Sequence, residues 1–126
     1  MDTKKVIFKT KNRNIEITCE IAKTIIEKTN GLMHREKLDK NKGMIFSFIL
    51  PWYRFFWMKN VKIPLDIIFV NRKNSIIKIH EAPIEKGLFY KMYSSHGFCK
   101  HVIETNIGFC KQNDIKENDC IKISKN

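Results

Sequence analysis

The chain has 126 residues, which is the usual length of one domain and enough to bury a hydrophobic core without metal ions or disulfide bonds. Hydrophobic residues make up 43% of the chain and charged residues 29%, a balance that excludes a largely disordered protein. The formal net charge is +11, so an acidic surface is excluded, whereas nucleic acid and anionic membranes stay open as partners. We predict a single domain over residues 1–126.

Alternation of apolar and polar residues, together with a near-continuous apolar run at 65–70 that suits a central strand, predicts about eight short strands. In chain order they lie at residues 6–9, 14–21, 44–48, 54–60, 65–70, 75–80, 99–105 and 120–124. Thr24-Ile25-Ile26-Glu27 is a capping-box pattern that begins a short helix, and Gly31 supplies the left-handed residue that ends it. A second helical turn is predicted at 108–113. The fold class is therefore mainly β, an antiparallel sandwich or small barrel with one or two short helices.

The positive charge is scattered along the chain. Its densest run, between Lys4 and Arg13, is interrupted by Val6-Ile7-Phe8 and is typical of the polar side of a strand. No sequence signature of a recognition helix, a zinc finger or an RNA-binding module accompanies it. The charge indicates a solvated basic surface, and nucleic acid is disfavoured as a partner.

The sequence predicts no transmembrane segment. Its longest apolar stretch, Met44–Met58, is broken by Ser47, Pro51 and Arg54 and is shorter than the about 20 apolar residues that a spanning helix needs. The N-terminus has no apolar segment of the kind found in signal peptides. As written, the chain is expected to be cytoplasmic, and it is expected to be exported if it is a trimmed mature form.

The four cysteines form no C-x-x-C pair, which favours free thiols in a reducing compartment. Four residues of types that bind zinc lie within a short segment: His96, Cys99, His101 and Cys110. Their spacing fits no familiar zinc motif. We therefore predict no metal and no cofactor, and we expect these residues to have separate packing and surface roles.

Two segments are candidate surfaces. Residues 81–95 predict a loop of about 15 residues, and a loop that long in a small domain is often functional. The run Ile49-Leu50-Pro51-Trp52-Tyr53 follows the end of a predicted strand, where side chains often face water. Exposed apolar residues on a basic body mark a protein partner or an anionic membrane surface. We therefore predict Trp52 and Tyr53 as a partner surface, with peripheral membrane contact as one form of it.

Several segments together resemble the family called domain of unknown function 192. They are Gly31-Leu32-Met33-His34-Arg35, Gly43-Met44-Ile45-Phe46, Phe56-Trp57-Met58-Lys59-Asn60, Ile63-Pro64-Leu65-Asp66 and, more loosely, Val102-Ile103-Glu104. The resemblance covers about residues 17–123, with departures at Val61, where the family usually has Thr, and at Asn74, where it usually has Gly. It implies a mostly β, jelly-roll-like sandwich and a family in which many members are exported in bacteria. It implies no activity, because the family has no established one.

These motifs also contain the candidate ligand-binding residues, which are Arg35, Trp57, Lys59, Asn60 and Asp66. In a strand, Trp57 and Lys59 share a face, and an outward-facing pair of this kind suits sugars or anionic ligands. Arg35 offers a planar fork to a carboxylate or phosphate, and Asp66 can pair with Lys59 or Arg35. The alternative is a structural network in which a buried pair of Lys59 and Asp66 would be costly to break.

Three functions remain open from the sequence. The leading hypothesis is a non-enzymatic module that binds an unknown small ligand or protein through the candidate residues. The alternative is a small enzyme, such as a hydrolase, that uses Lys59 and Asp66 as a charged pair. Serine-based hydrolysis is disfavoured because Ser95 and His96 are adjacent, and we expect Glu104 to be a strand-face carboxylate paired with a lysine. A basic nucleic-acid binder is the third.

Overall fold

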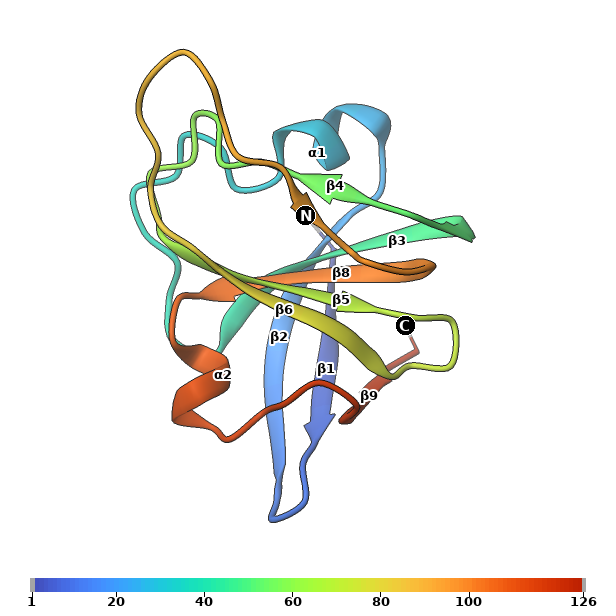
Figure 1. Cartoon of the computed structure of the whole chain (residues 1–126). Coiled ribbons are helices and arrows are strands. Elements are labelled where there is room, and N and C mark those ends of the chain that lie inside the picture. Colours follow the sequence, from blue (N-terminus) through green and yellow to red (C-terminus); the bar gives the residue numbers. More distant parts are fainter. Residues whose placement is uncertain (1, 126) are drawn as a thin grey trace.

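The structure is a computed structural model that describes residues 2–125 (Figure 1). Within this range the chain forms nine strands and two short helices. They are β1 (Thr3–Lys9), β2 (Asn14–Ala22), α1 (Ile25–Asn30), β3 (Lys42–Trp52), β4 (Phe55–Phe56), β5 (Leu65–Val70), β6 (Ile76–Ala82), β7 (Tyr93–Ser94), β8 (Cys99–Asn106), α2 (Phe109–Gln112) and β9 (Cys120–Ile123). The predicted mainly β class is confirmed. Neither helix of the described range has the length or apolar character needed to cross a bilayer.

Seven strands form one sheet in the order β6-β5-β8-β3-β2-β1-β9, and β4 pairs with β7 in a second, two-stranded sheet. One pair departs from the antiparallel expectation, because β2 and β3 run parallel, with Thr18 opposite Lys42. Parallel neighbours need a crossover connection, and α1 with the segment 31–41 provides it.

The sheet curls until its two edge strands meet (Figure 1). Asn118 N–H donates to the Ile76 carbonyl at 2.8 Å, and Ile76 N–H donates to the Asp119 carbonyl at 2.9 Å. Ile121 N–H donates to the Asn74 carbonyl at 2.8 Å. These bonds join the start of β6 to β9, so the predicted small barrel is confirmed in a partly closed form.

Apolar residues gather on both faces of the central strands. One cluster fills the barrel and includes Phe8, Ile17 and Ile68. A second cluster covers the outer face of β3, β5 and β8 and includes Phe46 and Ile67. All six residues of β5 are buried, as its near-continuous apolar run predicts.

The local signals at α1 are confirmed. Thr24 Oγ accepts a hydrogen bond from Glu27 N–H at 3.0 Å, and the Glu27 carboxylate accepts one from Thr24 N–H at 3.2 Å. Gly31 ends the helix with a φ of +49°. This capped helix leads the chain directly into the Gly31–Arg35 motif.

The prediction for residues 54–60 is wrong beyond Phe56. The strand β4 covers only Phe55–Phe56, and the chain then turns, with Asn60 at a φ of +61°. The short strand β7 lies inside the segment 81–95, which the sequence predicts as loop alone.

Candidate functional site

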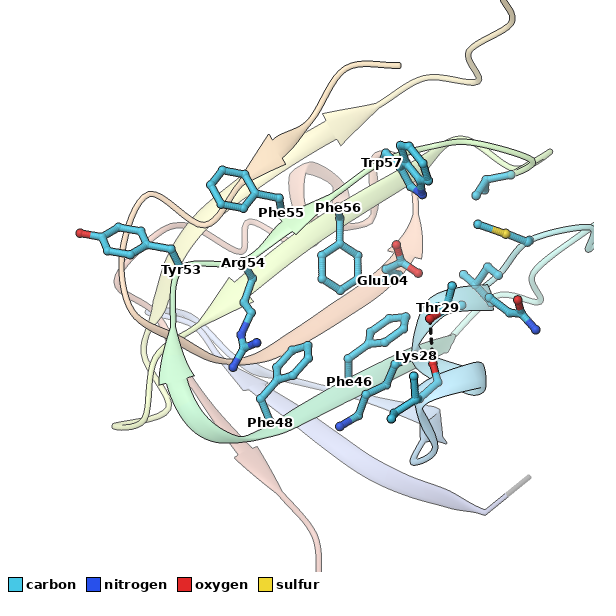
Figure 2. A pocket seen from close by; sticks show the side chains of 16 residues that line it. Lys28, Thr29, Phe46, Phe48, Tyr53, Arg54, Phe55, Phe56, Trp57 and Glu104 are labelled. Carbon is cyan, nitrogen blue, oxygen red and sulfur yellow. Dashed lines mark hydrogen bonds between the residues drawn. The ribbon is translucent and has the colours of Figure 1, made fainter. Parts of the chain in front are cut away.

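A pocket of about 460 Å³ opens on the outer face of the sheet, between α1 and β4 (Figure 2). Its walls are aromatic. Phe46 and Phe48 project from β3, and Phe56 projects toward them from β4, with Trp57 next to it. Phe46 and Phe56 pack edge to face, with ring centroids 5.0 Å apart. The alternation that places Met44, Phe46 and Phe48 on one face of β3 therefore builds one side of the pocket.

The carboxyl group of Glu104 lines this pocket from β8. Glu104 lies opposite Met44 of β3 and Ile67 of β5, so it interrupts a row of apolar side chains. The residue is only 4% exposed, and burial raises its pKa to about 8. No ion pair or side-chain hydrogen bond to Glu104 exists among residues 2–125, so the expected lysine partner is absent. At neutral pH this group is mostly a neutral acid.

Two motif glycines allow the chain to pack closely around Glu104. A Cβ atom on Gly43 would lie 2.6 Å from the Glu104 carbonyl oxygen, closer than real contacts permit. A Cβ on Gly31 would lie 3.2 Å from the Phe46 ring and 3.5 Å from Glu104 Oε1. The Gly31–Arg35 and Gly43–Phe46 motifs thus converge on the acid of the Val102-Ile103-Glu104 segment.

Two cations lie at the mouth of the pocket. Lys28 Nζ is 4.9 Å from the centre of the Phe48 ring, and the Arg54 guanidinium carbon is 3.9 Å from it. Arg54 also donates to the Leu50 carbonyl at 2.7 Å, while its buried Nε has no hydrogen-bond partner in the described part of the chain. The pocket is therefore positive at its mouth, apolar along its walls and neutral but polar at Glu104.

Of the five predicted ligand-binding residues, only Trp57 lines this pocket. Lys59 Nζ lies 5.3 Å from the centre of the Trp57 ring, and both side chains are exposed, so they form the outward aromatic-cation pair considered from the sequence. Asn60 does not line the pocket. Its backbone carbonyl accepts a hydrogen bond from His34 N–H at 2.9 Å, which joins the turn after β4 to the Gly31–Arg35 motif.

Arg35 and Asp66 are engaged elsewhere. Arg35 is half-buried and pairs with the Glu20 carboxylate of β2, which raises the pKa of Arg35 mainly through their hydrogen bonds. Asp66 is buried, and its carboxylate accepts hydrogen bonds from Gly108 N–H at 3.2 Å and Cys110 N–H at 2.9 Å. Burial outweighs these bonds and raises the pKa of Asp66. No ion pair joins Asp66 to Lys59 or Arg35 in the described range, so the predicted Lys59–Asp66 pair does not form.

The four candidate zinc ligands are separated. Cys110 packs inside the barrel and Cys99 on its outer face, while His101 Nδ1 lies 2.7 Å from Ser47 Oγ. Within residues 2–125, no group of three or more His, Cys, Asp or Glu side chains is arranged to hold a metal ion. All four cysteines are free thiols, and Cys120 alone is exposed.

Comparisons with known proteins agree with the motifs. The model of the family DUF192, described as "Uncharacterized ACR", matches residues 6–123. A crystal structure of a proposed transcription regulator from Sinorhizobium meliloti 1021 is 27% identical, covers 97% of this chain and 94% of that one, and has a TM-score of 0.90. A protein of unknown function from Novosphingobium aromaticivorans DSM 12444 is 31% identical, with 94% and 83% covered and a TM-score of 0.87. No curated protein matches the chain.

Proposed function

The chain belongs to the uncharacterized DUF192 family, and from its geometry we propose that it binds a small amphipathic molecule in the pocket around Glu104. One observation carries the proposal: a buried carboxyl group without a protein partner faces an aromatic-walled pocket. With no protein partner, the carboxyl oxygens can bond only to molecules that enter the pocket. A ligand group that bonds to Glu104 would supply the missing partner.

The chemistry of the pocket defines the ligand class. A neutral carboxylic acid both donates and accepts a hydrogen bond, so Glu104 suits an uncharged polar group such as a carbonyl or hydroxyl. The aromatic walls suit an apolar ring or chain, and Lys28 and Arg54 suit an anionic group at the outer end. The volume of about 460 Å³ falls in the range of roughly 300–1,000 Å³ of small-molecule sites.

Acid-base catalysis by Glu104 is a second candidate function. A pKa of about 8 is close enough to neutral for proton transfer in either direction. Binding is the better-supported function, because no second titratable side chain in the described range forms an ion pair or hydrogen bond with the Glu104 carboxyl group. An enzyme that uses Lys59 and Asp66 has less support, because Asp66 is occupied by the backbone of α2.

The test uses 8-anilinonaphthalene-1-sulfonate, a probe with an aromatic body and one anionic group. We expect saturable binding that shifts the NMR amide signals of Gly31, Phe48 and Phe56. Lys28→Glu should weaken binding about tenfold, because it reverses a charge at the mouth.

Lys40→Glu is the matched control, since it makes the same charge change in the exposed turn before β3. It should bind the probe as the parent does. The proposal is overturned if the signal shifts gather away from the pocket, or if the two variants weaken binding equally.

A further inference from the structure

Three segments meet at one end of the barrel: residues 47–54, which form the last part of β3 and the link to β4, residues 71–75 between β5 and β6, and residues 95–98 before β8 (Figure 1). Ring contacts join the first and third, because Trp52 stacks on Phe98 at 5.4 Å and Tyr53 meets the edge of Phe98 at 5.1 Å. Arg72 and Phe98 line one pocket, which joins the second segment to the other two. We call this surface the aromatic end; its apolar residues are Ile49, Leu50, Trp52, Tyr53 and Phe98.

The apolar side chains of the aromatic end face solvent. Ile49 is 90% exposed, Leu50 71% and Trp52 60%. Exposed apolar side chains gathered at one end of a fold mark a docking surface. Tryptophan and tyrosine are the residues enriched at the interface between membrane and water, where an apolar ring and a polar group are both accommodated.

The charge of the aromatic end has one sign. Residues 47–54, 71–75 and 95–98, together with the first two residues of β8, include Arg54, Arg72, Lys73 and Lys100 and no Asp or Glu. Arg72 and Lys73 are exposed and form no ion pair within residues 2–125. Basic residues beside an apolar surface complement anionic headgroups. The same charge disfavours a second copy of the chain, because self-association would bring two basic ends together.

Two backbone carbonyls of the aromatic end have partners among its own cations. Lys100 Nζ donates to the Ile49 carbonyl at 2.7 Å, and Arg54 Nη2 donates to the Leu50 carbonyl at 2.7 Å. Carbonyl groups without partners are expensive to move into an apolar phase. Because these two carbonyls have partners, moving Ile49 and Leu50 out of water costs less free energy.

We propose that the aromatic end docks the protein onto anionic phospholipid membranes. Ile49 and Leu50 enter the boundary between headgroups and acyl chains, as the apolar face of an interfacial segment does. Trp52, Tyr53 and Phe98 lie at the level of the headgroups. Arg72 and Lys73 contact lipid phosphates.

Vesicle flotation tests this docking. The parent should float with vesicles of phosphatidylcholine that contain about 0.3 mole fraction phosphatidylglycerol, and much less with phosphatidylcholine alone. Leu50→Asp should weaken partitioning about tenfold or more, because it removes an exposed leucine side chain that would become buried on docking. Arg72→Gln with Lys73→Gln should weaken it about 25-fold, since each basic residue near an anionic surface contributes about fivefold. In a Trp57→Phe background, Trp52 emission should shift to the blue with anionic vesicles.

Two controls match these changes. Leu88→Asp alters a leucine in the loop 83–92 that is even more exposed than Leu50, and Lys9→Gln with Lys11→Gln removes two exposed charges near the β1–β2 turn. Both should float as the parent does. The proposal is overturned if the parent does not float, if the controls weaken flotation as strongly as the test variants, or if Leu50→Asp leaves flotation unchanged. A dimer in analytical ultracentrifugation that Leu50→Asp dissociates, without vesicle binding, would assign the surface to a second copy instead.

Discussion

Glu104 is an acid in a position where an apolar residue would pack, and this makes the stability of the protein depend on pH. Burial raises its pKa from 4.5 to about 8, so the folded chain keeps a proton that the unfolded chain loses. The contribution of Glu104 to stability is complete below pH 4.5 and is lost as the pH rises through 8.

The glutamine in Glu104→Gln cannot ionise, so this variant should not lose stability as the pH rises through 8. Relative to the variant, the parent should lose up to about 5 kcal/mol of unfolding free energy between mildly acidic and alkaline pH. Urea unfolding across this range measures the difference. Glu16→Gln, at an exposed residue of β2, should follow the parent. Parallel profiles for the parent and Glu104→Gln would contradict the prediction.

Gly43 is the residue that the packing around Glu104 constrains most tightly. A Cβ atom would lie 2.6 Å from the backbone oxygen of Glu104, which cannot move without disturbing the pairing of β3 with β8. Gly43→Ala should therefore lower the free energy of unfolding by about 1–3 kcal/mol. Gly97→Ala is the control in thermal unfolding, because its Cβ would make an ordinary 3.5 Å contact with Ile77. Equal midpoints for the two variants would contradict the argument.

The sequence could not identify Glu104 as a pocket residue, because alternation places a single acid in a strand on a solvent face. Here the outer face of β8 is covered by α1, β4 and the segments around them, and that cover comes from residues distant in sequence. The one local signal was the identity of its neighbours, Val102-Ile103 before it and apolar strands on either side. Trp57 could be predicted as a site residue because its motif belongs to the segments that cover the outer face of β8.

At the scale of elements, the N-terminal end of helix α2 is capped by a side chain from strand β5. Gly108, which precedes the helix, has a φ of +86° and provides no side-chain cap. The Asp66 carboxylate of β5 takes that role by accepting from Gly108 and Cys110. The motif residue Asp66 therefore fastens α2 to the sheet.

This arrangement separates Asp66 from Lys59 in a stability measurement. Asp66→Ala should lower the free energy of unfolding by about 1–3 kcal/mol, because two N–H groups lose their acceptor. Lys59→Ala should change it by less than about 0.5 kcal/mol, since Lys59 is exposed and its ammonium lies over the exposed Trp57 ring. Denaturant unfolding of both variants decides the matter. Equal, large losses would restore the buried Lys59–Asp66 pair.

Elements were predictable where a local cause fixes them. The apolar run 65–70 matches β5 and the capping box begins α1, because both signals lie within one turn or strand. Residues 57–60 also alternate, yet they turn away from the extended path, and the backbone of Asn60 at positive φ pairs with His34. Val61 N–H closes that turn locally by donating to the Met58 carbonyl at 3.1 Å, and the bond from His34 ties it to a segment about 26 residues away, which strand alternation does not report.

At the scale of the whole molecule, strand number was predictable and connectivity was not. The parallel pairing of β2 with β3 follows from the crossover through α1. The closure of the barrel follows from contacts between residues 74–76 and 118–121. Both depend on contacts between residues distant in sequence, which the periodicity within a single strand does not predict.

Closure of the barrel can be measured by hydrogen exchange. The amides of Ile76, Asn118 and Ile121 donate the three bonds that join the sheet edges, so they should be protected nearly as strongly as those of β5. The amides of Leu88 and Phe89 lie in an exposed loop and make no backbone hydrogen bond in the described range, so they should exchange fast. If the three closure amides exchanged as fast as this loop while β5 stayed protected, the sheet would be open in solution. The apolar cluster inside the barrel would then lose packing where the two sheet edges meet, because Ile76 and Ile121 both join the edges and belong to that cluster.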